Sequence, residues 1–214
     1  KATFTVDASI NSVNIGKGAN SVSGNTVLGE TALDAVTTGG SNTAIGYNAL
    51  TALTTGSQNT AVGQIALDAA TTASNNVAVG RAALTNSTTG SNNVAVGSGA
   101  LQENTDAAGN VAVGYLALTA NTTGTYNTAV GFKSLDANTT GQYNTAVGNH
   151  ALGSNTANNN TAFGYNALKA NTTASGNVAI GYLALEDNTT GTNNVAVGIN
   201  CLSANTTGGS NIAI

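Results

Sequence analysis

The sequence offers few side chains that could carry out acid–base, nucleophilic or metal chemistry. His150 is the only histidine and Cys201 the only cysteine. Catalysis needs titratable groups that converge in a pocket, but His150 occupies a variable position of a tandem repeat, where other copies have Asn48 or Lys133. Such a position is typical of a surface. Cys201 stands where other copies have Ala, so we expect a small buried thiol. The sequence therefore predicts a protein that is not an enzyme.

The carboxylates are too sparse to predict a metal site. Four of them directly follow a Leu, at a position that Thr51 or Lys169 fills in other copies: Asp34, Asp68, Asp136 and Glu186. This variability indicates a solvated face. The G-G-x-G-x-D motif of calcium-binding β-rolls is absent from the sequence. We therefore expect no metal ion and no cofactor.

The charge pattern argues against nucleic acids and membranes as partners. The chain has a net charge of −4 and only five basic residues, so no basic stripe can neutralise a phosphate backbone. The longest apolar runs have four or five residues, far fewer than a bilayer-spanning helix needs. We expect neither nucleic-acid binding nor membrane insertion.

The elements that position these side chains recur with a fixed period. Each copy closes a short apolar run with Gly, and the spacing is constant, as from Gly46 to Gly63 and Gly80, except that the step from Gly148 to Gly164 is shorter by one. The consensus is N-[TV]-A-[VI]-G-x-x-A-L-x-x-N-T-T-G-x-x. A unit of about 17 residues is too short for a helical hairpin but fits one coil of a β-solenoid. The sequence therefore predicts an all-β protein.

We expect one repeat domain, residues 12–214, preceded by a leading strand or linker, residues 1–11. About twelve such coils would stack as a parallel β-solenoid, at a strand spacing of about 4.8 Å. A shorter first coil is expected between Gly16 and Gly29, which lie closer together in the sequence than the later glycines. The missing residue between Gly148 and Gly164 is expected in a turn, which can absorb it without a slip of the strands.

Within a coil, the pattern N-[TV]-A-[VI]-G predicts a strand. Its β-branched residues would point to one side and its Ala to the other. The Gly would end the strand where the chain turns tightly. The Ala-Leu pair that follows, such as Ala49-Leu50, is expected to begin a second short strand, and N-T-T-G to form a turn.

Stacked coils place like residues over like. One predicted ladder is made of Asn side chains that bond coil to coil: Asn42, Asn59, Asn76, Asn93, Asn110, Asn127, Asn144, Asn160, Asn177 and Asn194. A second, dry ladder is made of Leu: Leu50, Leu67, Leu84, Leu101, Leu118, Leu135, Leu152, Leu168, Leu185 and Leu202. Because both strand faces are small or apolar, we expect copies of the chain to cover the second face, with closed cyclic symmetry.

The stretches "NTAIGYNAL", "NVAVGYLAL" and "NTAFGYNAL" resemble two related classes of repeat. One is the head of trimeric autotransporter adhesins. The other, closer in unit length and in its N-T-T-G segment, belongs to tail-fibre and virion structural proteins of tailed phages and to phage-like bacterial surface proteins. The resemblance covers residues 12–214 and implies a left-handed β-roll wound as a homotrimer. Its motifs are specific for the repeat class, which fibres and adhesins share.

Two surface features are candidates for recognition. Aromatic residues follow the closing Gly in several copies, where they could stack on sugar rings or anchor a protein interface: Tyr47, Tyr115, Phe132, Tyr165 and Tyr182. Tyr126 and Tyr143 precede the strand Asn. The Thr pairs, such as Thr54-Thr55, would form two parallel files of hydroxyls, as in ice-binding solenoids.

These patterns predict a non-enzymatic structural fibre or rod of a phage tail fibre or a cell-surface appendage, which supports attachment to a host or surface. Such a protein would be extracellular or on the virion surface. Its expected partners are copies of itself, as a homotrimer or a higher assembly, with a host glycan or receptor as a further candidate. An adhesin that binds glycans through the solenoid and a self-assembling filament are alternatives, and an ice-binding protein is a third.

Overall fold

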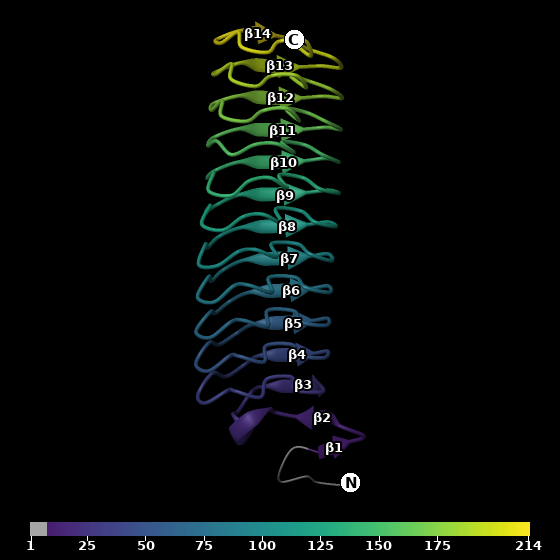
Figure 1. Ribbon diagram of the computed structural model, residues 1–214, viewed down its shortest axis with the longest axis vertical. Coiled ribbons are helices and arrows are strands. Elements are labelled where there is room, and N and C mark those ends of the chain that lie inside the picture. Colours follow the sequence, from purple (N-terminus) through teal and green to yellow (C-terminus); the bar gives the residue numbers. More distant parts are fainter. Residues whose placement is uncertain (1–7) are drawn as a thin grey trace. The chain divides into compact units, whose positions relative to one another are not determined.

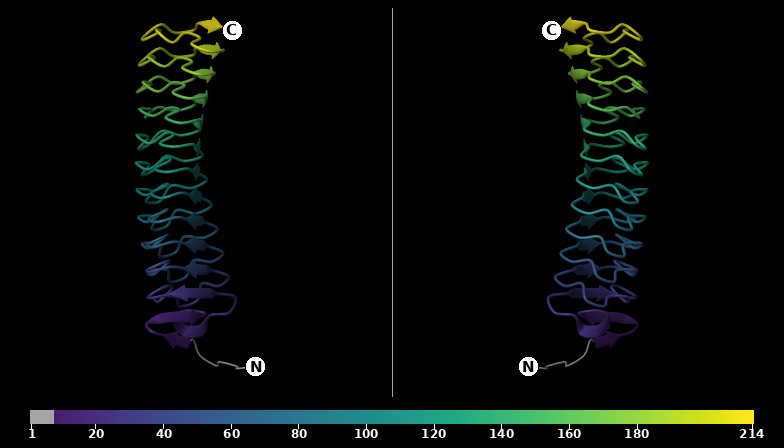
Figure 2. Two further views of the ribbon diagram at one scale, coloured as in Figure 1. Left: turned by 90° about the vertical axis from the view of Figure 1, so that its right-hand side faces the viewer. Right: turned by 90° about the vertical axis from the view of Figure 1, so that its left-hand side faces the viewer.

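The computed structural model describes residues 8–214 and confirms a parallel β-solenoid, with about 11 turns of about 17 residues. The described residues contain strands, turns and one short 3-10 helix, η1 (Ala19–Ser21). The chain divides into two compact units, Lys1–Ala107 and Ala108–Ile214. In each unit the strands gather along one side of the coils and turns follow the other sides (Figure 2).

The described part of the first unit stacks its strands in sequence order (Figure 1). From β3 to β7 neighbouring strands are parallel, and equivalent residues of successive coils pair, such as Thr43 with Thr60. The strands are β1 (Ala8–Ile10), β2 (Val13–Gly16), β3 (Thr26–Gly29), β4 (Thr43–Ile45), β5 (Thr60–Val62), β6 (Val77–Val79) and β7 (Val94–Val96).

The second unit continues the same pattern of parallel pairing (Figure 1). Thr145 pairs with Thr161 across the shortened coil, so the register survives the missing residue, as predicted. The strands are β8 (Val111–Val113), β9 (Thr128–Val130), β10 (Thr145–Val147), β11 (Thr161–Phe163), β12 (Val178–Ile180), β13 (Val195–Val197) and β14 (Ile212–Ala213).

The N-terminal end of the repeat differs from the prediction. β2 pairs with β3 in the antiparallel direction, and β1 pairs with β2 in the same way. The predicted coil between Gly16 and Gly29 is therefore not a solenoid coil, because the few residues between the two strands reverse the chain instead of carrying it around a full turn. Parallel stacking begins at β3 rather than at residue 12. Of the predicted leading segment, residues 8–10 form β1, and residues 1–7 lie outside the described residues.

The strand itself has the predicted alternation. From β4 to β13 the central Ala is buried in every strand, and the residues on either side are partly or largely exposed. The small Ala side chain lies inside, and the β-branched side chains point outward. The closing Gly131 has φ 135°, and a Cβ there would lie 2.5 Å from the carbonyl oxygen of Gly148. Only glycine fits this position.

The prediction of a second short strand at the Ala-Leu pair is wrong. The pair lies in turns, and its Leu has a left-handed backbone, with φ 54° at Leu50 and φ 52° at Leu118. Most of these Leu residues still donate their N–H to the next coil, for example Leu50 to the Ala66 oxygen at 3.1 Å. The left-handed residue turns the chain around the coil while its side chain enters the core.

The Leu ladder is the core of each unit, as predicted, except that Leu202, its last predicted member, is only half-buried. From Leu33 to Leu185, every Leu of this position is fully buried, including Leu50, Leu67, Leu118, Leu135 and Leu168. Full burial of such a side chain contributes about 1.5–3 kcal/mol. The same Leu in every coil therefore gives each turn a similar hydrophobic contribution.

Candidate functional site

The titratable side chains of the described residues do not converge. No group of three His, Cys, Asp or Glu residues in residues 8–214 could hold a metal ion. Cys201 is half-exposed rather than buried, unlike Ala184 at the same position of the preceding coil.

Asp136, in the second unit, has a shifted pKa. Burial raises the pKa of its carboxyl above the ordinary value, and this effect exceeds the opposing effects of a backbone hydrogen bond and of the charges on His150 and Lys133. The His150 ring meets the Phe132 ring edge-on, with centroids 5.5 Å apart. These residues form a small charged cluster beside an aromatic ring.

The raised pKa of Asp136 predicts a pH effect on stability. Between the ordinary and the raised pKa, the folded state binds more protons than the unfolded state, so the free energy of unfolding falls as pH rises. Asp136→Asn should remove this slope and be more stable than the wild type at neutral pH, with a smaller difference in acid. Urea unfolding at several pH values measures it, and Asp187→Asn, at an exposed position, controls for the loss of one charge. A wild type and Asp136→Asn with parallel pH profiles would contradict the assignment.

The predicted Asn ladder is present in both units. Its members are buried, including Asn59, Asn76, Asn93, Asn127 and Asn144. In most links, the side-chain Oδ1 of one Asn accepts the backbone N–H of the equivalent Asn in the next coil. The Nδ2 of the first Asn donates to a backbone carbonyl of that next coil, a few residues before its Asn. Asn144, for example, receives the Asn160 N–H at 3.0 Å and donates to the Ala157 oxygen at 2.8 Å. The ladder ties coils together, and its buried amides face the neighbouring coils rather than a ligand.

The second unit holds another file of buried Asn that the sequence did not reveal. Its members come from the N-T-T-G segment, for which a turn is predicted: Asn121, Asn138, Asn155, Asn171 and Asn188. Asn138 Nδ2 donates to Asn121 Oδ1 and to the Gly141 oxygen, both at 3.0 Å. At the shortened coil the file is interrupted, because Asn155 Nδ2 donates to the Ala157 oxygen and Asn138 Oδ1 has no partner.

A signal for this second file exists in the sequence. In the first unit the equivalent position holds Val36, Leu53 and Ala70, which are all fully buried. A position that accepts Val and Leu belongs to the core, so an Asn there must be buried with its hydrogen bonds made inside the protein.

The Thr pairs provide one free file of hydroxyls rather than the predicted two. In most pairs the first Thr donates its hydroxyl to the backbone of the next coil. Thr54 bonds the Thr71 oxygen and Thr122 bonds the Thr139 oxygen, each at 3.0 Å. The second Thr, such as Thr55 or Thr123, is exposed. This reduces the ordered hydroxyl array that an ice-binding surface needs.

The predicted aromatic residues lie on the surface, and four of them stack in pairs. Tyr47, Tyr115, Phe132, Tyr165 and Tyr182 are each 44–50 % exposed. Tyr115 stacks on Phe132 at 5.5 Å between centroids, and Tyr165 stacks on Tyr182 at 5.4 Å. Each ring of a pair covers one face of its partner, which reduces the ring surface on which a sugar could stack.

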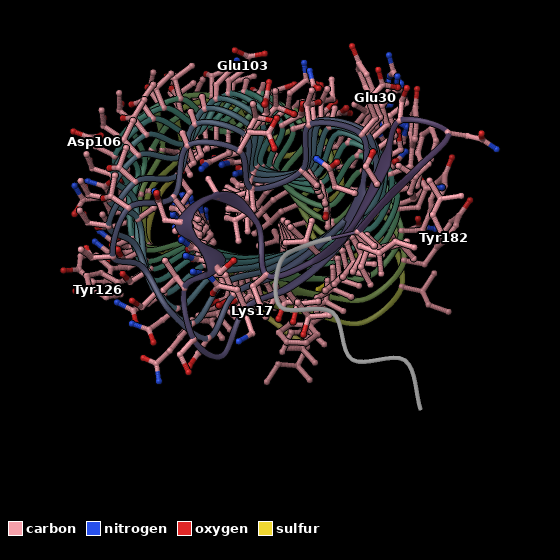
Figure 3. All side chains as sticks on the ribbon, turned by 90° about the horizontal axis from the view of Figure 1, so that it is seen from below. Lys17, Glu30, Glu103, Asp106, Tyr126 and Tyr182 are labelled. Atoms are coloured by element: carbon pink, nitrogen blue, oxygen red, sulfur yellow. The ribbon has the colours of Figure 1, made fainter. Side chains whose placement is uncertain are left out.

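Another aromatic pair lies on a different side of the coils. Tyr126 stacks on Tyr143 with centroids 5.5 Å apart, and both are more than half exposed. Figure 3 shows Tyr126 and Tyr182 pointing outward on opposite sides. Gly109 makes room for this pair, since a Cβ there would lie 2.7 Å from the Tyr126 ring.

The outward sheet face is an uncharged, mostly apolar surface of each unit. It consists of two columns, formed by the residues on either side of the central residue of each strand, from Thr26 to Ile214. These columns hold only Thr, Val, Ile, Leu and Phe, so none of their side chains is charged. Three of its bulky members, Leu28, Phe163 and Ile180, are 41–44 % exposed. The aromatic residues that follow the closing Gly lie next to it along the chain. This face is the candidate functional site.

No family model, curated protein or solved structure matches the chain. The described residues also contain no helix with the length and apolar character of a membrane span.

Proposed function

We propose that the chain is a non-enzymatic structural protein of a phage tail fibre or a cell-surface appendage, where it supports attachment to a host or surface. It acts outside the cell or on the virion, as a homotrimer of parallel, left-handed solenoids. The number three and the handedness come from the resemblance to adhesin heads and tail fibres. The observation that carries the proposal is the uncharged, in-register sheet face.

The partner that suits this face is a second copy of the chain. A surface that contacts it over several coils must repeat at the same spacing, since Val130 and Val147 stand at equivalent positions of neighbouring coils. Another copy has the same period and the same absence of charge. Side-by-side packing of such faces buries β-branched side chains against one another, which is the main favourable term in protein association.

Charge placed on this face should prevent assembly. We expect the wild type to have three times the 20.8 kDa mass of one chain, and the double variant Val130→Lys, Val147→Lys to have the mass of one chain. Light scattering after size-exclusion chromatography measures this. Thr123→Lys, Thr140→Lys adds the same charge at exposed positions of the same unit and should leave the trimer intact.

Three outcomes decide between the alternatives. A wild type with the mass of one chain would overturn the proposal. A series of sizes that grows with protein concentration would indicate the filament instead of a closed trimer. Equal dissociation of both double variants would show that general charge, rather than the sheet face, controls assembly.

A further inference from the structure

The chain contains seven N-x-[ST] sequences, the acceptor motif for N-linked glycans. Their asparagines are Asn86, Asn121, Asn138, Asn159, Asn171, Asn188 and Asn205. This motif ordinarily marks a surface loop of a secreted protein. In this protein the seven positions fall into two structurally different groups.

Five of the acceptors are the Asn residues of N-T-T segments, which point into the coil. Asn121, Asn138, Asn171 and Asn188 have no exposed surface, and Asn205 is half-buried. These side chains belong to the second Asn file rather than to a solvated turn.

Both amide hydrogens are already used at these positions. Asn171 Nδ2 donates to Asn155 Oδ1 at 2.7 Å and to the Ala174 oxygen at 2.9 Å. Asn188 Nδ2 donates to Asn171 Oδ1 at 3.1 Å and to the Gly191 oxygen at 2.9 Å. One of these hydrogen bonds must be lost when Nδ2 carries a sugar, because only one hydrogen remains on it. The oxygen that accepted the lost bond is then buried without that donor.

The chemistry of N-glycosylation shows why a buried Asn cannot carry the product in the folded protein. An oligosaccharyltransferase uses a lipid-linked oligosaccharide diphosphate. A bond forms between Nδ2 and C1 of the first sugar, the bond from C1 to the diphosphate oxygen breaks, and the lipid diphosphate and one Nδ2 proton leave. The product has a pyranose ring attached to an atom with no path to solvent, and interiors packed at crystal-like density have no room for it.

The other two acceptors lie on the outside. Asn159 is exposed, in a left-handed turn with φ 60°, where its backbone N–H donates to the Gln142 oxygen at 3.0 Å. Asn86 is half-exposed, and its Nδ2 donates to the exposed Glu103 carboxylate at 2.8 Å. Solvent can replace that bond, and Nδ2 keeps a second hydrogen.

We propose that Asn86 and Asn159 are the positions at which the folded protein can carry an N-linked glycan, and that a glycan on any N-T-T asparagine prevents its coil from closing. Because transferases act on chains that are still unfolded, burial in the folded protein does not protect the N-T-T positions. A chain that meets such a transferase before it folds is therefore expected to be modified at the N-T-T positions as well, and its coils then do not close.

Secretion of the full chain from a eukaryotic cell line, directed by an added signal peptide, tests the proposal. The matched variant changes the third residue of each N-T-T segment and leaves the Asn in place: Thr123→Ala, Thr140→Ala, Thr173→Ala, Thr190→Ala and Thr207→Ala. Asp106 naturally replaces this Thr after Asn104, so the coil tolerates the change. The same variant made in bacteria, compared with the wild type by urea unfolding, verifies its fold.

We expect the wild type to be lost from the medium and retained in the cells with glycans on N-T-T asparagines. The variant should be secreted, protease-resistant and glycosylated at Asn86 and Asn159, as read by mass spectrometry of its peptides. Protease-resistant protein with a glycan on Asn138, Asn171 or Asn188 would overturn the proposal. The proposal would also be overturned if the variant folds in bacteria but is retained inside the eukaryotic cells. Secreted variant that lacks a glycan at either Asn86 or Asn159 would overturn it as well.

Discussion

Replacing Asn144 by Ala is expected to lower the free energy of unfolding by about 1–3 kcal/mol. Its Oδ1 is the acceptor for the buried Asn160 N–H at 3.0 Å, and without it this N–H has no partner. Its Nδ2 donates to Asn127 Oδ1 at 3.1 Å and to the Ala157 oxygen at 2.8 Å. Those two acceptors each keep one other bond, so the orphaned N–H dominates the loss.

Asn149→Ala is the matched control for this prediction. Asn149 lies in the same coil and is exposed, so its truncation removes an amide from solvent and leaves the stack unchanged. Urea unfolding gives the free energies, and hydrogen exchange of the Asn160 amide reports the link itself. Equal stability of the two variants, with Asn160 still protected, would show that the ladder does not hold the coils together.

The sequence was sufficient to predict those features that a strict repeat imposes. Residues one period apart have the same neighbours, so the strand, the buried Ala and the Asn and Leu ladders follow from the spacing alone. The stacking of Tyr115 on Phe132 follows in the same way, because these residues are also one period apart. Similarly, loss of one residue in a turn leaves the register intact, since a turn is not constrained by strand pairing.

The features that spacing could not predict depend on how one coil closes on itself. Leu118 adopts φ 52° because the chain must change direction at that point, and Leu has no local preference for this conformation. Asn138 looks like a turn residue by type, but closure of the coil directs it inward. The antiparallel β2 depends on the short connection to β3, which the repeat consensus does not describe.

The candidate site was predicted in kind but not in detail. Exposure of the aromatic residues follows from their variable position after the Gly. Whether their ring faces are open depends on side-chain geometry between coils, and in the stacked pairs each ring covers one face of its partner. By contrast, an apolar outer sheet face follows from the alternation in the strand, because both the Ala row and the rows of β-branched residues are small or apolar.

The second large effect is expected at Leu185, where Leu185→Ala should lower the free energy of unfolding by about 2–5 kcal/mol. Leu185 is fully buried, and truncation leaves a cavity that the stacked backbone cannot close. Leu183 provides an unusually close control, since it is half-exposed but has nearly the same backbone, with φ 56° against φ 50° at Leu185. Both donate their N–H to a neighbouring coil at 3.0 Å.

Because the two positions share their backbone strain and hydrogen bond, the difference between Leu185→Ala and Leu183→Ala isolates the cost of the cavity. We expect Leu183→Ala to change the free energy of unfolding by about 1 kcal/mol or less. Urea unfolding of both variants measures this difference. If both cost the same, the loss would come from replacing Leu in a left-handed turn, and the dry Leu ladder would not be the source of the stability of the second unit.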